Sequence, residues 1–164
     1  MAGSENADGG VRLRAVQADD LPLFFAHQQD AESVHMAAFT AKDPSDEAAF
    51  RAHWDRILSD ETIIARTIVY DGAVAGHIVQ FELDGEAEVS YWIDRAYWGK
   101  GIATRALLAL LELVPVRPMY GRAVKDNIGS IRVLEKCGFV IVGEDKGFAN
   151  ARRVEVEEYV LKLE

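Results

Sequence analysis

The segment YWIDRAYWGKGIATRALLALLELVP, residues 91–115, decides the fold, because a strand-like run turns directly into a strongly apolar helix. Gly99 and Gly101 form the turn between the two elements. A helix N-terminus leaves backbone N–H groups unpaired and carries the positive end of the helix dipole. Because glycines let a bulky anion approach those groups closely, the segment predicts a phosphate cradle. The alternative is that the two glycines only permit a tight turn.

Two other phosphate-binding motifs do not fit this segment. A P-loop requires G-x-x-x-x-G-K-[ST], whereas Gly101 follows Lys100 and no glycine stands at the required position before it. A dinucleotide fingerprint requires G-x-G-x-x-G, but Thr104 occupies the position of the third glycine. The cradle therefore needs a different explanation.

Length and charge narrow the class of protein. The chain has 164 residues, so we expect a flexible tail over residues 1–10 and one domain over residues 11–164. Its 18 basic and 27 acidic residues give a net charge of −9, which argues against nucleic-acid binding and favours a cationic substrate. No apolar run approaches the roughly 20 residues that span a membrane, and no signal peptide is evident. A single cysteine, Cys137, fits a reducing cytoplasm.

Hydrophobic periodicity predicts the order β-α-α-β-β-β-α-β-α-β-β, a mixed α/β domain around one sheet. Asp-Gly pairs at residues 71–72 and 84–85 predict hairpin turns, so the three central strands form an antiparallel meander. The expected strands are 11–16, 61–70, 73–83, 86–94, 119–124, 139–145 and 152–164, and the expected helices are 18–29, 45–60, 102–114 and 126–137. For residues 33–44 the sequence is compatible with either a short helix or a loop.

The strand at residues 86–94, the following helix and the strand at 119–124 predict a right-handed crossover with parallel strands. A bulge near Glu157 would reconcile the two parities of apolar residues in the last strand.

Helix boundaries follow from capping residues. Ser45 is the expected cap of the helix at 45–60, whose apolar face repeats at Phe50, Trp54 and Leu58. Asp19 or Asp20 is expected to cap the first helix. Asp126 or Asn127 is expected to cap the helix at 126–137, with Ile128, Ile131 and Leu134 on one face.

The glycine turn resembles a known family. DRAYWGKGIATRAL is similar to the acyl-CoA loop of the GNAT N-acetyltransferases, whose pattern is Gln/Arg-x-x-Gly-x-Gly/Ala, and Gly101 and Ala103 match its last two fixed positions. Trp98 replaces the usual Gln or Arg, as in the ribosomal-protein-alanine acetyltransferase-like branch that the chain resembles. DNIGSIRVLEKCGF resembles the second CoA segment of the family, with Asn127, Ser130, Lys136, Gly138 and Phe139 in place.

The resemblance implies a GNAT-like fold in which acyl-CoA lies between two parallel strands that splay apart after a β-bulge. In this chain we expect that bulge near residues 90–92. It also implies an enzyme that moves an acetyl group from acetyl-CoA to a primary amine by direct attack in a ternary complex. The residues that would bind the cosubstrate are Tyr91, Trp92, Ile93, Trp98, Gly99, Lys100, Gly101, Ile102, Ala103, Thr104, Asn127 and Ser130. Leu134 stands at the family's usual tyrosine position, so a non-catalytic acyl-CoA sensor is an alternative. Nucleotide binding by the glycine turn is a third hypothesis.

Acyl transfer to an amine needs a base for the amine and is helped by a proton donor to the thiolate. Glu88 is the candidate base, because strict alternation places it on one face with Glu86, Ser90 and Trp92. Glu86 is the weaker choice because it adjoins the turn. For Glu88 the alternative is a solvated carboxylate. Ser130 is the candidate donor, and its alternative is a first-turn serine that satisfies a backbone N–H.

The remaining polar residues are assigned structural roles. Cys137 is expected to be a packed thiol. His77 is expected to be a satisfied core histidine, and the alternative is that it lines the acceptor pocket. His27, His35 and His53 have no metal-ligand spacing, so no metal is expected. The acceptor, a small-molecule amine or a protein N-terminus, is expected between residues 35–44 and the loop at 144–153. The oligomeric state is left open between a monomer and a homodimer.

Overall fold

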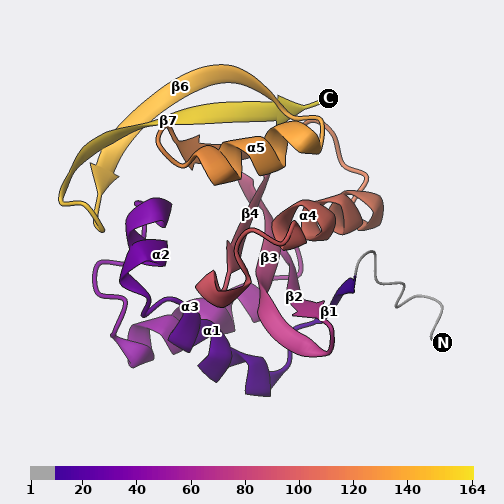
Figure 1. The fold of residues 1–164 in the computed structure, drawn as a ribbon, viewed down its shortest axis with the longest axis vertical. Coiled ribbons are helices and arrows are strands. Elements are labelled where there is room, and N and C mark those ends of the chain that lie inside the picture. The colour runs from indigo at the N-terminus through magenta and orange to yellow at the C-terminus, as the bar shows by residue number, and fades with distance from the viewer. Residues whose placement is uncertain (1–9) are drawn as a thin grey trace.

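The computed structural model of the protein describes residues 10–164 (Figure 1). The predicted tail therefore lies outside the described residues, except for Gly10. One sheet of seven strands runs in the order β1-β2-β3-β4-β5-β7-β6. Its strands are β1 Val11–Ala15, β2 Ile64–Tyr70, β3 Ala73–Leu83, β4 Glu86–Ile93, β5 Met119–Val124, β6 Val140–Ala149 and β7 Val154–Leu163. The predicted mixed α/β sheet is confirmed.

Helices cover both faces of this sheet. They are α1 Leu21–His27, α2 Ala31–Ala37, α3 Glu47–Ser59, α4 Ile102–Leu113 and α5 Ile128–Lys136, with short 3-10 turns η2 Ala18–Asp20 and η3 Arg95–Tyr97. Leu107 of α4 and Leu134 of α5 belong to one core cluster, and Phe24 of α1 and Trp54 of α3 to a second. Figure 1 shows α1–α3 gathered on the side of the strands away from α4 and α5. Residues 33–44 comprise the last part of the short helix α2 and the loop that follows it.

β4 and β5 are parallel, as predicted, but they pair only briefly. The pairs Ala87↔Met119 and Glu88↔Tyr120 are the whole of their ladder. Beyond Glu88, β4 continues to Ile93 with its other edge on β3. The two parallel strands therefore separate after Glu88 and leave one edge of β4 open.

The bulge expected near residues 90–92 is wrong. The β3–β4 register runs unbroken from Leu83↔Glu86 to Gly76↔Ile93. The irregularity lies instead between β2 and β3, at Ile68 and Val69. No kink in β4 is needed, because it is β5 that diverges from the regular β3–β4 pair.

The bulge expected near Glu157 is also wrong, because the β6–β7 register runs unbroken from Gly143↔Val160 to Ala149↔Val154. Tyr159 and Leu161 pack into the core under α4 and α5. Val156, of the other parity, packs with Ala38, Val124 and Ala149 on the opposite face. The register shift of the β6–β7 pair lies at Ile141 and Gly143 instead. The change of parity thus reflects contacts on both faces of β7, although Val156 is only partly buried and Val154 is exposed.

Two of the predicted helix features need correction. Asp46, not Ser45, caps α3, since its carboxylate accepts from the N–H of Ala49 while Ser45 donates to Asp43. Leu58 is exposed, and Ile57 packs on the core in its place.

The predicted cap Asn127 of α5 is confirmed, with its side chain accepting from the N–H of Ser130 at 3.2 Å. Ile131 and Leu134 are buried, as the apolar face predicts. Ile128, however, lies in the first turn of α5 and is 50% exposed.

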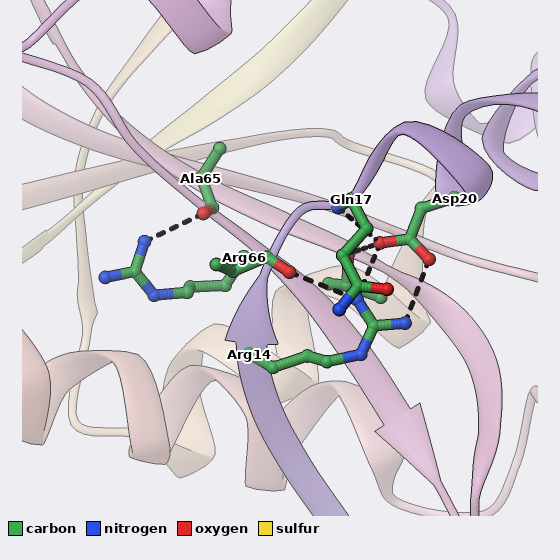
Figure 2. Close-up of polar contacts among 7 residues, drawn as sticks. Arg14, Gln17, Asp20, Ala65 and Arg66 are labelled. Carbon is green, nitrogen blue, oxygen red and sulfur yellow. Dashed lines mark hydrogen bonds and ion pairs between the residues drawn. The ribbon is translucent and has the colours of Figure 1, made fainter.

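Asp20 occupies the N-cap position of α1, as expected, but its side chain makes no capping hydrogen bond to α1 and instead joins three elements (Figure 2). Its carboxylate accepts from both terminal nitrogens of Arg14 at 2.7 and 2.9 Å, from the N–H of Gln17 at 2.8 Å and from the Thr67 hydroxyl at 2.7 Å. Burial alone would raise the pKa of Asp20, but these hydrogen bonds outweigh it and lower the pKa. The network ties β1 and the start of α1 to β2, which fixes α1 on its face of the sheet.

Candidate active site

A cleft of about 1440 Å³ opens where β4 and β5 separate. One wall is formed by the loop before α4, the start of α4 and the helix α5. The opposite wall is formed by α2 with its following loop, α3 and β3. The first wall includes Gly99, Gly101, Thr104, Asn127 and Ser130. The second wall includes Met36, Thr40, Trp54, His77 and Phe81.

The glycine turn has the geometry that an anion cradle requires. Gly99 and Gly101 adopt φ of +79° and +75°, which L side chains rarely adopt, and Gly101 is the N-cap of α4 without a side-chain cap. A Cβ added at Gly99 would meet nothing within 4 Å. The glycines thus serve the tight turn, and they also leave open space before the helix N-terminus. Lys100 is not among the residues that line the cleft.

Trp98 holds this loop to the end of β4. Its indole N–H donates to the carbonyl of Ile93 at 2.9 Å, while the ring is 43% exposed. Ile93 and Ile102 are buried in the core, so they contribute mainly backbone to the cleft.

The hydroxyl of Tyr91 on β4 lies 2.8 Å from the hydroxyl of Ser130 on α5. The hydroxyl of Ser130 does not cap the helix. The cap is Asn127, whose side chain accepts a hydrogen bond from the N–H of Ser130. Burial raises the pKa of Tyr91 to about 12, so the phenol keeps its proton. Its pairing with Ser130 was not predicted. Asn127 also donates to the carbonyl of Met36 at 3.4 Å and so joins α5 to α2.

Glu88 is a buried carboxylate rather than a solvated one, with 5% of its surface exposed. Its Oε1 accepts from Nε of Arg122 at 3.3 Å. Arg122 also donates to Glu158 at 3.0 Å and to Asp145 at 3.2 Å. Burial raises the pKa of Glu88, and the nearby guanidinium opposes that rise only in part. Glu86 is exposed and lies outside the cleft lining.

Arg122 and Glu158 were not predicted from the sequence, although both line the cleft together with Glu88. The available signal was Arg122, the one charge in the short strand MYGRAV. Glu158 left no such signal, because VEVEEYVL also carries Glu155 and Glu157. A charge in a strand inside a sheet is costly unless it is paired, so it marks a candidate site.

Side chains of α3 and β3, those of Trp54, His77 and Phe81, form an aromatic wall of the same cleft. The ring of His77 lies 4.8 Å from that of Phe24 and 4.9 Å from that of Trp54. Burial lowers the pKa of His77 to about 3, so its ring is neutral. The favoured prediction of a satisfied core histidine is wrong, because the buried Nδ1 of His77 has no hydrogen-bond partner in the described part of the chain. His77 lines the cleft instead, in agreement with the alternative.

Cys137 is a packed thiol, as predicted. It is 8% exposed, and its thiol donates to the carbonyl of Thr104 at 3.6 Å. Burial raises its pKa to about 11, so the nucleophilic thiolate is disfavoured. Within residues 10–164, no cluster of His, Cys, Asp and Glu has the arrangement of a metal site.

One predicted wall of the acceptor site is wrong. Residues 144–149 belong to β6, and none of residues 144–153 lines the cleft. The turn after β6 is bonded to the loop after α2, since Ala151 N–H donates to the carbonyl of Ala38 and Asn150 donates to that of Thr40. The side chains of α3 and β3 take its place, because these elements carry the bulky aromatic residues that reach the cleft.

Comparison with known proteins gives a consistent result. A family model described as an acetyltransferase (GNAT) domain matches residues 11–140. The putative ribosomal N-acetyltransferase YdaF of Bacillus subtilis (strain 168) is 32% identical over 117 residues, which cover 65% of this chain and 64% of that protein. The match thus spans slightly less than two thirds of the length of that curated relative.

Two further comparisons cover more of the chain. The spermidine N(1)-acetyltransferase of Escherichia coli (strain K12) is 26% identical over 141 residues, or 82% of this chain and 75% of that protein. The crystal structure of the microcin C7 self-immunity acetyltransferase MccE with acetyl-CoA and AMP superposes with a TM-score of 0.81 over 98% of both chains, at 16% identity. This last likeness concerns the fold. In the described residues, no helix is long and apolar enough to cross a membrane.

Proposed function

This chain belongs to the GNAT family of acetyltransferases, and we propose on that premise that residues 11–164 act as one N-acetyltransferase domain. It moves an acetyl group from acetyl-CoA to a primary amine by direct attack of the amine on the thioester. The observation that carries the proposal is the open, glycine-turned N-terminus of α4, which faces a cleft beside the buried carboxylate of Glu88.

Acetyl-CoA would lie in the cleft between β4 and β5. Its pyrophosphate would be held by the backbone N–H groups from Gly99 to Thr104, where the helix dipole also favours negative charge. Its pantetheine arm would follow the unpaired edge of β4 at Tyr91, Trp92 and Ile93, which offers backbone hydrogen-bonding groups. Acetyl-CoA is a consumed cosubstrate, and no metal is required for this chemistry.

Glu88 would accept the proton of the incoming amine, directly or through water, which leaves the nitrogen lone pair free to attack. The collapse of the tetrahedral intermediate breaks the carbon–sulfur bond and releases the CoA thiolate. Ser130 would donate a hydrogen bond or a proton to that sulfur. The hydroxyl of Tyr91 at 2.8 Å supports this role, because it can donate to Ser130 and leave the serine proton free for the ligand.

The acceptor would be a small-molecule amine or a protein N-terminus, bound against the aromatic wall of α3 and β3. The related YdaF and spermidine N(1)-acetyltransferase are both N-acetyltransferases by name, which favours catalysis over a non-catalytic sensor. A cytoplasmic location, where acetyl-CoA is available, belongs to the same proposal. The chain would work as a monomer or as a homodimer.

Steady-state turnover with a panel of amines tests the proposal. The panel holds short peptides with free N-termini, spermidine and simple alkylamines, and the readout is the release of the free CoA thiol. Amine-dependent release is expected. A protein that binds acetyl-CoA and turns over none of these amines would point to the sensor function. Tighter binding of ATP than of acetyl-CoA would support the nucleotide hypothesis.

Gly101→Val is expected to abolish the increase in melting temperature caused by acetyl-CoA. For the wild type, a ligand at a hundredfold excess over its Kd adds about 2.7 kcal/mol to the free energy of unfolding. The valine side chain would crowd the cradle, and its positive φ would cost about 1–2 kcal/mol in the free protein.

Gly72→Val is the matched control. Gly72 also has a positive φ of +84° and open space around its Cβ, but it lies in the β2–β3 turn away from the cleft. This variant should lose similar stability and keep the full acetyl-CoA shift. Equal loss of the shift in both variants would contradict the cradle.

A further inference from the structure

Arg122 lies at the point where the two parallel strands part. Main-chain pairing between β4 and β5 ends at Glu88↔Tyr120. Arg122 is two residues further along β5, on the same face as Tyr120, and its Nε reaches back to Oε1 of Glu88 at 3.3 Å. A side-chain contact thus continues the link between the strands at the place where the backbone ladder stops.

The other end of the same guanidinium is fixed by the last two strands. Nη1 of Arg122 donates to Glu158 of β7 at 3.0 Å and to Asp145 of β6 at 3.2 Å. Glu158 has only 12% of its side chain exposed. A planar guanidinium bound on two sides has little freedom to rotate, so it can hold a carboxylate in one orientation.

We propose that Arg122 is a positioning residue for Glu88, which it orients so that one carboxylate oxygen is left for the acceptor amine. The inference rests on the proposed role of Glu88 as the base. Oε1 is occupied by Arg122, whereas Oε2 has no hydrogen-bond partner in the described part of the chain. Both residues line the cleft, so the free oxygen is the one that accepts the proton of the amine.

The charges around Glu88 give this arrangement a testable signature. Arg122 on β5 favours the ionised form of Glu88 and so lowers its pKa, whereas Glu158 on β7 and Asp84 in the β3–β4 turn raise it. Asp145 on β6 acts through its contact with Arg122. Removing the arginine and removing the neighbouring glutamate must therefore shift the pKa of Glu88 in opposite directions.

The experiment compares the pH profiles of kcat/KM for Arg122→Met and Glu158→Gln with that of the wild type. Arg122→Met should shift the acidic limb of the kcat/KM profile to higher pH, by about one pH unit or more. It should also lower kcat by on the order of 10- to 100-fold through misplacement of the base, with KM for acetyl-CoA unchanged. Glu158→Gln should move the limb down.

Lys125→Met is the matched control. Lys125 also joins β5 to the β6–β7 pair, through Glu144 and Glu157, but it does not contact Glu88. This variant loses the same charge and should keep the wild-type limb. Arg122→Lys keeps the positive charge but loses the planar guanidinium that holds the carboxylate. It should therefore lower kcat and leave the pH of the acidic limb nearly unchanged.

The double variant Glu88→Gln/Arg122→Met should be no slower than Glu88→Gln alone, because Arg122 acts through Glu88. A further loss of the size seen for Arg122→Met alone would overturn the proposal. So would an unmoved limb in Arg122→Met, or a shift in the same direction for both single variants. Failure of the proposed function would be seen separately, as absence of amine-dependent CoA release by the wild type.

Discussion

Glu88→Gln is expected to lower kcat for amine acetylation by on the order of 10²–10⁴, the usual contribution of a general base. Glutamine keeps the size and most of the packing of the buried side chain but cannot accept a proton from the amine. The affinity for acetyl-CoA should barely change, because the proposed cradle lies at the other end of β4. Initial rates at saturating acetyl-CoA and amine, with the melting temperature of the variant, measure the effect.

The pH dependence supplies a second readout for the same variant. Burial raises the pKa of Glu88 above its usual range, so kcat/KM for the wild type should rise with pH through a limb that lies above that range. The limb should vanish in Glu88→Gln. Glu86→Gln is the control, because Glu86 is exposed and lies outside the cleft lining. Near-normal turnover of Glu88→Gln at neutral pH, or a loss confined to Glu86→Gln, would contradict the assignment.

Gly76→Ala is expected to destabilise the fold strongly, because a Cβ at this residue of β3 would collide with the backbone of β4. A Cβ at Gly76 would lie 2.0 Å from the carbonyl oxygen of Trp92 and 3.1 Å from Cα of Ile93. Both are backbone atoms, so the strands must separate to admit a methyl group. We expect a loss of about 3 kcal/mol or more in the free energy of unfolding.

Chemical denaturation measures that loss, and Gly143→Ala is its control. Gly143 is also a strand glycine, in β6, and a Cβ there would meet nothing within 4 Å. Gly143→Ala should be neutral or slightly stabilising, by up to about 1 kcal/mol. Because Trp92 and Ile93 form the open edge of β4, Gly76→Ala should also weaken acetyl-CoA binding. A Gly76→Ala protein as stable as Gly143→Ala would show that the two strands lie further apart than in this structure.

The local features of the fold were predictable from the sequence. The turns at Asp71-Gly72 and Asp84-Gly85 both have the positive φ that Asp-Gly pairs favour. The bounds of β5 match the apolar run 119–124, and Asn127 caps α5 as its position before the apolar run indicates. These features depend on residues close in sequence, where turn chemistry and periodicity act directly.

The errors arose where distant residues decide the outcome. The two parities of β7 suggested a bulge, yet Val156 is buried by Ala38, which is more than a hundred residues away in sequence. The β6–β7 loop was expected at the cleft, but hydrogen bonds to the loop after α2 place it behind that loop. Neither contact leaves a periodic signal.

The site shows the same contrast between local features, which were predicted, and contacts between distant residues, which were not. Alternation along one strand placed Glu88 on the same face as Ser90 and Trp92, and all three line the cleft. The partner of Glu88 comes from β5, and Arg122 is held in turn by β6 and β7. The order of strands in the sheet, with β7 inserted between β5 and β6, brings these charges together. That order depends on packing of the whole chain, and so the ion-pair cluster was missed.

The most direct test of the account is a screen for acetylated products in a cell lysate given acetyl-CoA and the purified protein, read by mass spectrometry. The account predicts at least one amine that gains an acetyl group with the wild-type protein, and far less of that product with Glu88→Gln. Absence of any new acetylated amine, from a wild-type protein whose melting temperature rises with acetyl-CoA, would contradict it. That result would leave a chain that binds the cosubstrate without transferring its acetyl group.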